Sequence, residues 1–180
     1  MNEEALIDGC IRQDPSCQKQ LFMLYSRKMM TVCLRYARNR ADAEDILQDG
    51  FVRLFQKIHQ YKAEGSFEGW IRRIFVNASL KKYQTKKWSM EQTGVEYVEE
   101  GKIDPDIIST LSEQEILQLI GELPEGYKVV FNMYVIEGYS HKEISEILGI
   151  NEATSRTQLL KARKHLQQKM CRLGVYERPV

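Results

Sequence analysis

The sequence has few of the residue types that build metal centres and disulfide frameworks. Its 180 residues include four cysteines and three histidines, with no C-x-x-C pair and no histidine at metal-ligand spacing from a cysteine. Such spacings are the usual signatures of zinc sites and of small disulfide-linked domains. We therefore expect no metal and no cofactor, and we interpret the cysteines as reduced, partly buried structural thiols. They are Cys10, Cys17, Cys33 and Cys171.

The sequence also lacks long apolar runs. No segment approaches the roughly 20 apolar residues that a helix needs to cross a bilayer. The first residues do not form a charged segment followed by an apolar core, as a secretory leader would. We therefore expect a cytoplasmic protein with no direct membrane insertion. The composition, with 43% hydrophobic and 28% charged residues, is ordinary for a soluble globular protein.

Strand patterns are scarce as well. No stretch alternates apolar and polar residues between hairpin turns, whereas nearly every periodic segment has the helical period. The predicted fold class is therefore all-α, with two small helical domains. Asp14 and Pro15 should begin a helix that runs to about Arg38. Further helices should begin at Asp42, at Ser66, at Ser112 with Glu115 in a capping box, and after Pro124.

A net charge of +1 gives no sign of a nucleic-acid partner, but the charges are segregated along the chain. No acidic residue lies between Glu68 and Glu91, and that span contains Arg72, Arg73, Lys81, Lys82, Lys86 and Lys87. From Glu91 to Asp106 the acidic residues meet only Lys102, and the helical rhythm fades. We expect one domain at 1–88, a flexible acidic linker at 89–111 and a second domain at 112–180.

Residues 140–166, SHKEISEILGINEATSRTQLLKARKHL, have the pattern of two short helices joined by a tight turn. Ser140 and Glu143 form an S-x-x-E capping box at the start of the first helix. Gly149 stands where a helix ends in a left-handed residue, and Asn151 can cap the next helix. The spacing predicts a helix-turn-helix.

The second of these helices has the character of a DNA reader. Leu159, Ala162 and Leu166 fall on a buried stripe by helical spacing. No acidic residue occurs between Glu152 and Glu177, whereas solvated faces normally mix their charges. The alternative is a pair of amphipathic helices with no DNA-binding role. The faces that could enter a major groove carry Thr154, Arg156, Thr157, Gln158 and Lys161.

Aromatic and basic residues interleave from Tyr61 to Trp88, a combination that suits unpaired bases better than a duplex. Trp70 is the candidate stacking platform. One aromatic side chain would barely offset the few kcal/mol that unstacking costs per base, so further contacts from Arg73, Asn77 and Lys81 are expected. In the alternative interpretation, Phe67 and Trp70 are core residues and the lysines decorate the outside.

Three carboxylates, Asp42, Asp45 and Asp49, follow helical spacing in ADAEDILQDGFVRLF. A metal-dependent nuclease would need such carboxylates at the floor of a cleft, commonly beside a histidine or lysine that this segment does not provide. Capping and the helix dipole are a simpler role for Asp42 and Asp45. Gln48, Asp49 and Phe51 could instead form a mixed polar and apolar patch for a protein partner.

Taken in order, three motifs carry a family resemblance: AEDILQDGF followed by RLF, then FEGWIRRIFVNASLKKY, then LPEGYKVVFNMYVIEGYSHKEISEILGI. From about Leu21 to Met170 the chain resembles the extracytoplasmic-function (ECF) group of RNA polymerase sigma factors, in the sigma-70 family. The resemblance implies an initiation factor with no catalytic residue and no small-molecule substrate. Its partners would be core RNA polymerase, promoter DNA and an anti-sigma factor. The acidic linker would thread the polymerase cleft as an RNA mimic.

The resemblance also implies three sets of site residues. Core polymerase would bind Asp45, Gln48, Asp49 and Phe51. The minus-10 promoter element would be melted and held by Ser66, Phe67, Trp70, Arg73, Asn77 and Lys81. The minus-35 element would be read by Thr154, Ser155, Arg156, Thr157, Gln158, Lys161 and Arg163.

Two positions depart from the family pattern. Ser155 stands where family members often have a buried valine, and Gln158 stands where an arginine is common. Glutamine favours adenine where arginine favours guanine, so the promoter sequence does not carry over.

A stand-alone operator-binding regulator that uses only the C-terminal domain is the first alternative function, and a nuclease built on the aspartate cluster is the second.

Overall fold

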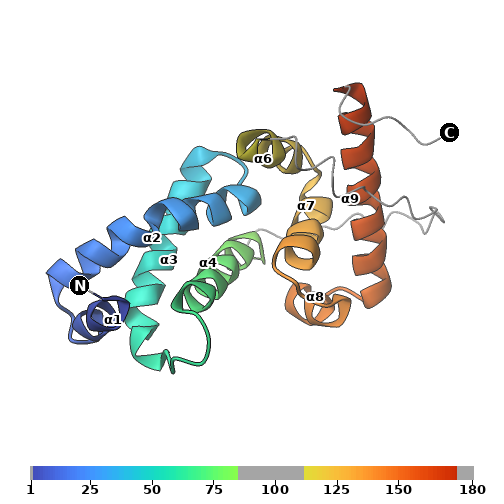
Figure 1. Ribbon diagram of the computed structural model, residues 1–180. Helices are drawn as coiled ribbons and strands as arrows, with labels where there is room; N and C mark the ends of the chain where they lie inside the picture. Colours follow the sequence, from blue (N-terminus) through green and yellow to red (C-terminus); the bar gives the residue numbers. More distant parts are fainter. Residues whose placement is uncertain (1, 85–111, 174–180) are drawn as a thin grey trace. The chain divides into compact units, whose positions relative to one another are not determined.

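The computed structural model describes residues 2–84 and 112–173, and the elements in both stretches are helices (Figure 1). The chain divides into two compact units, Met1–Trp88 (unit 1) and Ser89–Val180 (unit 2). The predicted all-α fold class is confirmed. The predicted linker at 89–111 lies outside the described residues.

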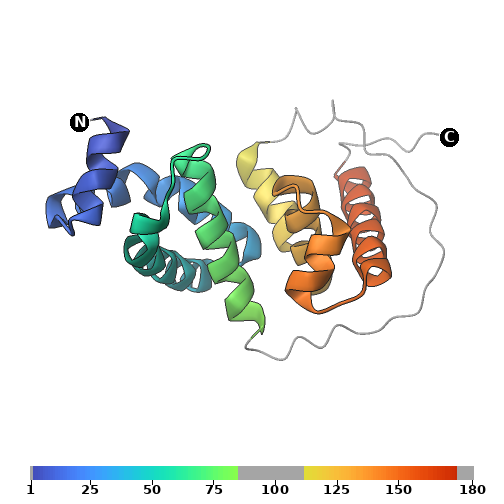
Figure 2. The ribbon, with the colours of Figure 1, turned by 90° about the horizontal axis from the view of Figure 1, so that it is seen from below.

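Unit 1 is a bundle of three helices that pack against one another, α2, α3 and α4, with α1 against α2 (Figures 1 and 2). The short α1 was not predicted; Asn2 caps it by accepting a hydrogen bond from the Ala5 amide at 2.9 Å. The elements are α1 (Glu3–Ile11), α2 (Pro15–Tyr36), α3 (Arg40–Lys57), the 3-10 turn η1 (Ile58–Gln60) and α4 (Phe67–Gln84).

The helix starts in unit 1 follow side-chain capping. Asp14 accepts from the Ser16 amide at 2.8 Å, and Ser66 Oγ accepts from the Gly69 amide at 3.1 Å, so both predicted starts are confirmed. The predicted cap at Asp42 is wrong. Asn39 has the extended backbone of a cap and accepts from the Asp42 amide at 2.8 Å, so α3 begins earlier and Asp42 lies in its first turn.

The core of unit 1 is apolar and tightly packed where α3 meets α4. Leu54, Ile71 and Phe75 are each fully buried, and burying a side chain of this size contributes roughly 1.5–3 kcal/mol. A Cβ atom at Gly50 would lie 2.3 Å from the ring of Phe75. Only glycine at this position therefore lets α4 approach α3 so closely.

Unit 2 has a second, smaller core. Val129, Met133 and Ile144 are fully buried, and Leu119, Leu123, Ala162, Leu166 and Met170 form one cluster. The predicted capping box of Ser112 and Glu115 is present. The elements are α6 (Glu113–Gly121), α7 (Glu125–Phe131), the π-helical turn η2 (Asn132–Ile136), α8 (His141–Leu148) and α9 (Glu152–Arg172).

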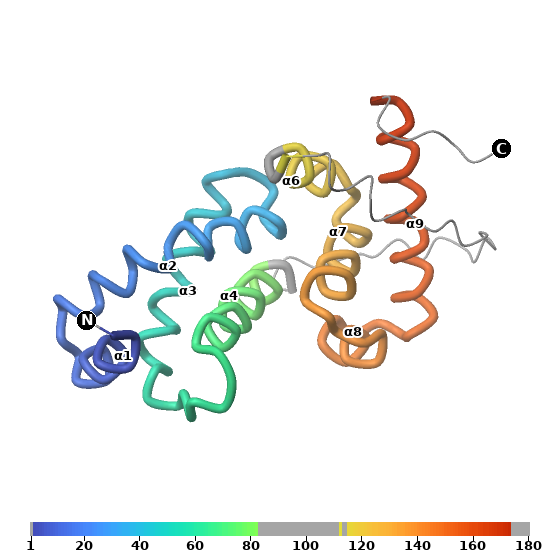
Figure 3. Tube along the Cα trace, in the orientation of Figure 1, coloured from blue at the N-terminus to red at the C-terminus, as the bar shows by residue number. Residues whose placement is uncertain are grey.

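Helices α8 and α9 form the predicted helix-turn-helix, and its tight turn can be followed in Figure 3. Ser140 and Glu143 make the reciprocal capping box, with the Ser140 amide donating to Glu143 Oε2 at 2.8 Å. Gly149 ends α8 in the left-handed conformation, at φ 69°. Asn151 caps α9 by accepting from the Thr154 amide at 2.6 Å. All three local predictions are confirmed.

The four cysteines are free thiols, as predicted, and three of them are buried. Burial raises the pKa of Cys33 to about 12 and, with the nearby Cys17 and Asp14, the pKa of Cys10 to about 11. Both thiols are therefore protonated at neutral pH.

None of the described helices is long and apolar enough to span a bilayer.

Candidate functional site

One face of α3 is polar and exposed. Asp45, Gln48 and Asp49 lie on it, one helical turn apart or side by side, while Ile46 and Leu54 on the opposite face are buried. The face thus presents carboxylate and amide groups to solvent on a helix whose other side is held by the core.

The structure differs from the sequence-based expectation at Phe51, which is 4% exposed. Its ring packs against Phe22 at 4.6 Å and Phe75 at 5.1 Å between centroids, so it supports the surface from beneath. The exposed apolar groups here are Phe22 and Val52, at 43% and 56% exposure. Val52 follows Gln48 by four residues, a spacing from which it could have been found; Phe22 lies on another helix and had no such signal.

A cleft of about 410 Å³ separates the exposed sides of α3 and α4. Lys82 spans it, with its ammonium 2.8 Å from Asp42 Oδ1 and 3.1 Å from Asp45 Oδ2. Burial lowers the pKa of Lys82, but the two carboxylates outweigh that effect and raise it above its ordinary value. The ammonium therefore stays charged and ties the two helices together. The cleft is lined by Asp45, Gln48, Asp49, Arg53, Ala78, Lys81 and Lys82.

Two members of the aspartate cluster, Asp42 and Asp45, have a structural role. Asp42 and Asp45 share one lysine, and Asp49 lies on the exposed face of α3. Within residues 2–84 and 112–173, no three histidine, cysteine, aspartate or glutamate side chains are arranged to hold a metal ion. The ion pair with Lys82 accounts for the carboxylates at the start of α3.

An aromatic cluster covers the start of α4. Phe67 is 1% exposed and lies 5.8 Å from Tyr25 and 5.0 Å from Tyr61 between ring centroids. Trp70 stacks on Phe67 at 5.9 Å with 17° between the ring planes, and it is half-buried. Phe67 is thus a core residue, as the alternative interpretation held for it, whereas part of Trp70 reaches solvent.

The outer face of α4 continues from Trp70. Arg73, Asn77 and Lys81 follow at steps of three or four residues and are exposed, so they share one side of the helix with the tryptophan. Ser66, which caps the helix, is also exposed beside this face. Four predicted residues and a half-buried indole therefore form one surface.

On the exposed side of α9, Arg156 forms an ion pair with Glu152. Arg156 Nη2 lies 2.8 Å from Glu152 Oε2, one turn earlier, and both side chains are largely exposed. An exposed pair of this kind contributes at most about 1 kcal/mol, so the guanidinium can exchange Glu152 for another acceptor at little cost. Thr154, Thr157, Lys161 and Arg163 are half-buried on the faces beside it.

Two predicted groove residues are instead inside unit 2. Ser155 is 0% exposed and Gln158 is 6% exposed, because both fall on the stripe of α9 that packs on the domain core. The Oε1 atom of Gln158 has no hydrogen-bond partner among the described residues. Neither side chain can reach a base in this arrangement. Spacing from Leu159 and Ala162 places them beside the buried stripe, but their polarity suggested the opposite.

Two family models match the chain in succession. The model for Sigma-70 region 2 matches residues 21–89, which include α2, α3 and α4. The model for Sigma-70, region 4 matches residues 113–166, from α6 into α9.

Curated relatives match over most of the chain. The ECF RNA polymerase sigma-E factor of Haemophilus influenzae is 25% identical over 183 residues, covering 94% of this chain and 96% of the relative. The ECF RNA polymerase sigma factor SigW of Bacillus subtilis is 29% identical over 159 residues, covering 82% and 85%.

Solved structures share the fold. CnrH in complex with the cytosolic domain of CnrY gives a TM-score of 0.50 at 17% identity, covering 93% of this chain and 96% of that one. The sigma factor RpoE in complex with the anti-sigma factor NepR from Bartonella quintana gives 0.52 at 18% identity, covering 85% and 96%.

Proposed function

This chain belongs to the extracytoplasmic-function group of the sigma-70 family, and we propose how its two units divide the work of directing RNA polymerase to promoters. Sigma factors are non-enzymatic initiation factors, so the surfaces described above serve for binding. The match of unit 1 to sigma region 2 argues against a stand-alone operator-binding regulator, because such a regulator would use only unit 2.

The exposed face of α3 is the proposed contact for core RNA polymerase. Asp45, Gln48 and Asp49 provide polar contacts, while Phe22 and Val52 provide the exposed apolar area that a protein partner would bury. Phe51 acts indirectly, because its ring holds Phe22 in place.

The outer face of α4 is the proposed surface for the opened minus-10 element. The exposed part of Trp70 can stack on an unpaired base, and Arg73 and Lys81 can contact phosphates along the same side of the helix. Ser66 and Asn77 add hydrogen-bonding groups beside them. Phe67 and Tyr61 pack against the indole, so the platform is already in position before DNA arrives.

Helix α9 is the proposed reader of the minus-35 element. The first residues of a recognition helix contact base edges, and Arg156 is the exposed cation there. Ser155 and Gln158 are left out of the direct contacts because they are buried. The proposed contacts are Thr154, Arg156, Thr157, Lys161 and Arg163.

The proposed arrangement is sigma domain 2 at 1–88 and sigma domain 4 at 112–180, joined by the acidic linker at 89–111. Two DNA-binding units on one chain raise the effective concentration of the second once the first has bound. We further propose a cytoplasmic location. We also propose control by an anti-sigma factor, since a solved structure of the same fold is a sigma factor with such a partner.

The observation that carries this proposal is the indole of Trp70, which packs on buried Phe67 and half-buried Tyr61 at the head of an exposed polar and basic face. Holoenzyme made from core polymerase and the full chain can select promoter duplexes from a randomised library. On a selected duplex, permanganate should detect unpaired thymines near the minus-10 element. If upstream protection is seen without any permanganate reactivity, α4 does not open the strands.

A further inference from the structure

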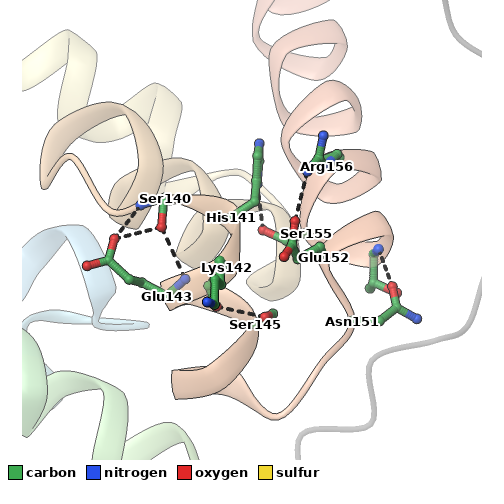
Figure 4. A network of polar contacts seen from close by, with 10 residues as sticks. Ser140, His141, Lys142, Glu143, Ser145, Asn151, Glu152, Ser155 and Arg156 are labelled. Atoms are coloured by element: carbon green, nitrogen blue, oxygen red, sulfur yellow. Dashed lines mark hydrogen bonds and ion pairs between the residues drawn. The ribbon is translucent and has the colours of Figure 1, made fainter.

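A hydrogen bond joins the two helices of the helix-turn-helix. His141, the first residue of α8, places its Nδ1 atom 2.8 Å from Ser155 Oγ on α9. Figure 4 shows the two side chains pointing toward each other across the turn, next to the Glu152–Arg156 ion pair. This bond therefore links α8 to the first turn and a half of α9, where the proposed base contacts lie.

The imidazole is held from a second element as well. Its ring stacks on Tyr134 of η2, with 4.4 Å between the centroids and 21° between the planes. Burial lowers the pKa of His141, and Arg156 and Arg163 act in the same direction and outweigh Glu152. A neutral imidazole has one donor nitrogen and one acceptor nitrogen. Its Nδ1 atom therefore either donates to Ser155 Oγ or accepts from it, according to the tautomer.

The bond has a clear energetic reason. Ser155 is 0% exposed, so its hydroxyl has no access to solvent, and a buried hydroxyl without a partner is destabilising. The serine of this chain requires a polar neighbour, and His141 provides it.

We propose that His141 is a positioning residue for promoter recognition. Acting through Ser155, it sets the rotation of α9 so that Thr154 and Arg156, on either side of that serine, face the minus-35 element. The inference rests on the proposed role of α9. It assigns a function to a residue that would touch neither DNA nor polymerase.

A double-mutant cycle on the full chain in holoenzyme tests this assignment. The variants are His141→Phe, which keeps a ring to stack on Tyr134, Ser155→Val, and the two combined. The probe is a fluorescein-labelled duplex that wild-type holoenzyme has selected from a library with a randomised upstream element. Each single change should weaken binding about tenfold, because it leaves one partner of the His141–Ser155 hydrogen bond unpaired. The combined variant should return to within about threefold of wild type, since an apolar pair replaces a polar one.

Two further measurements separate positioning from general damage. Affinity for a scrambled duplex should change less than about twofold, and the slope of log Kd against log salt should stay the same because no phosphate contact is lost. A slope reduced by about one for His141→Phe would mean that a protonated His141 neutralises a phosphate itself, and it would overturn the assignment. Equal loss on both duplexes would also overturn it.

The cycle itself has a decisive alternative outcome. If the two single effects multiply in the combined variant, or if neither single change weakens binding, His141 and Ser155 are not coupled and the assignment fails. Should a variant not fold, NMR of the wild-type imidazole nitrogens replaces the cycle, and a freely titrating, solvent-exposed Nδ1 would contradict the proposal. If wild-type holoenzyme selects no duplex at all, it is the proposed function of the chain that fails.

Discussion

The two units hold their functional surfaces in different ways. In unit 1, the exposed faces of α3 and α4 are backed by large apolar groups such as Phe51, Phe67 and Phe75. In unit 2, the helix-turn-helix is held by short polar contacts: the Ser140–Glu143 box at the start of α8, the Asn151 cap at the start of α9, and the His141–Ser155 bond between the two helices. An apolar core is destabilised when a buried side chain loses volume. A polar contact is weakened when either of its two partners is removed. The comparison therefore predicts different sensitivities in the two units.

The largest effect is expected for Phe75→Ala in unit 1. Removing this fully buried ring leaves a cavity between α3 and α4 and should lower the free energy of unfolding of unit 1 by about 3–5 kcal/mol. Trp70 packs on Phe67 in unit 1, and the sequence of unit 2 contains no tryptophan, so tryptophan fluorescence during urea unfolding reports on unit 1. Phe22→Ala is the matched control, because that ring is 43% exposed. Equal destabilisation by both changes would show that α3 and α4 are not packed as described.

Trp70→Ala should come next, with an effect on strand opening. Stacking of one base on an aromatic side chain is worth roughly 1–3 kcal/mol, so permanganate reactivity near the minus-10 element should drop about tenfold or more. Upstream protection by unit 2 should be nearly unchanged. Trp70→Phe keeps a smaller stacking surface, so its permanganate reactivity should lie between that of wild type and that of Trp70→Ala. A parallel loss of opening and upstream binding would count against the separate roles of the units.

Arg156→Ala tests the recognition face of α9. If the guanidinium contacts a base edge, the change should weaken upstream binding by roughly 1–3 kcal/mol and relax sequence preference at one position. Lys164→Ala, another exposed cation later on the same helix, is the control and should act equally on all sequences. A footprint identical to wild type would remove Arg156 from the proposed contacts.

The smallest effect is expected for Glu152→Gln, and its sign is opposite. The carboxylate holds Arg156 in free protein and would repel DNA phosphates. Its neutralisation should therefore strengthen upstream binding, by less than about 1 kcal/mol because the pair is exposed. Fluorescence anisotropy at low salt is the measurement that resolves so small a change. Weaker binding would indicate that Glu152 positions Arg156 for its contact.

Much of the fold could be predicted because its signals are local. Ser140, Gly149 and Asn151 act on backbone groups within a few residues of themselves, so the helix-turn-helix follows from spacing alone. The start of α3 was placed wrongly because Asn39 and Asp42 are both good caps; in the folded unit Asn39 makes the capping bond, and Asp42 pairs with Lys82 instead. That lysine lies about forty residues further along the chain, so spacing around Asp42 gives no sign of the pair.

The site was less predictable than the fold, because its signals are not local in the sequence. The sequence by itself determined the two helical units, the helix-turn-helix and the order of motifs that identifies the family, since periodicity, capping and charge segregation are properties of neighbours along the chain. Only the tertiary structure decided which side chains of those motifs reach solvent. It placed Phe51, Phe67 and Ser155 inside, exposed Val52 and Phe22, and joined His141 to Ser155. Burial depends on contacts between helices distant in sequence, and polarity alone does not reveal them.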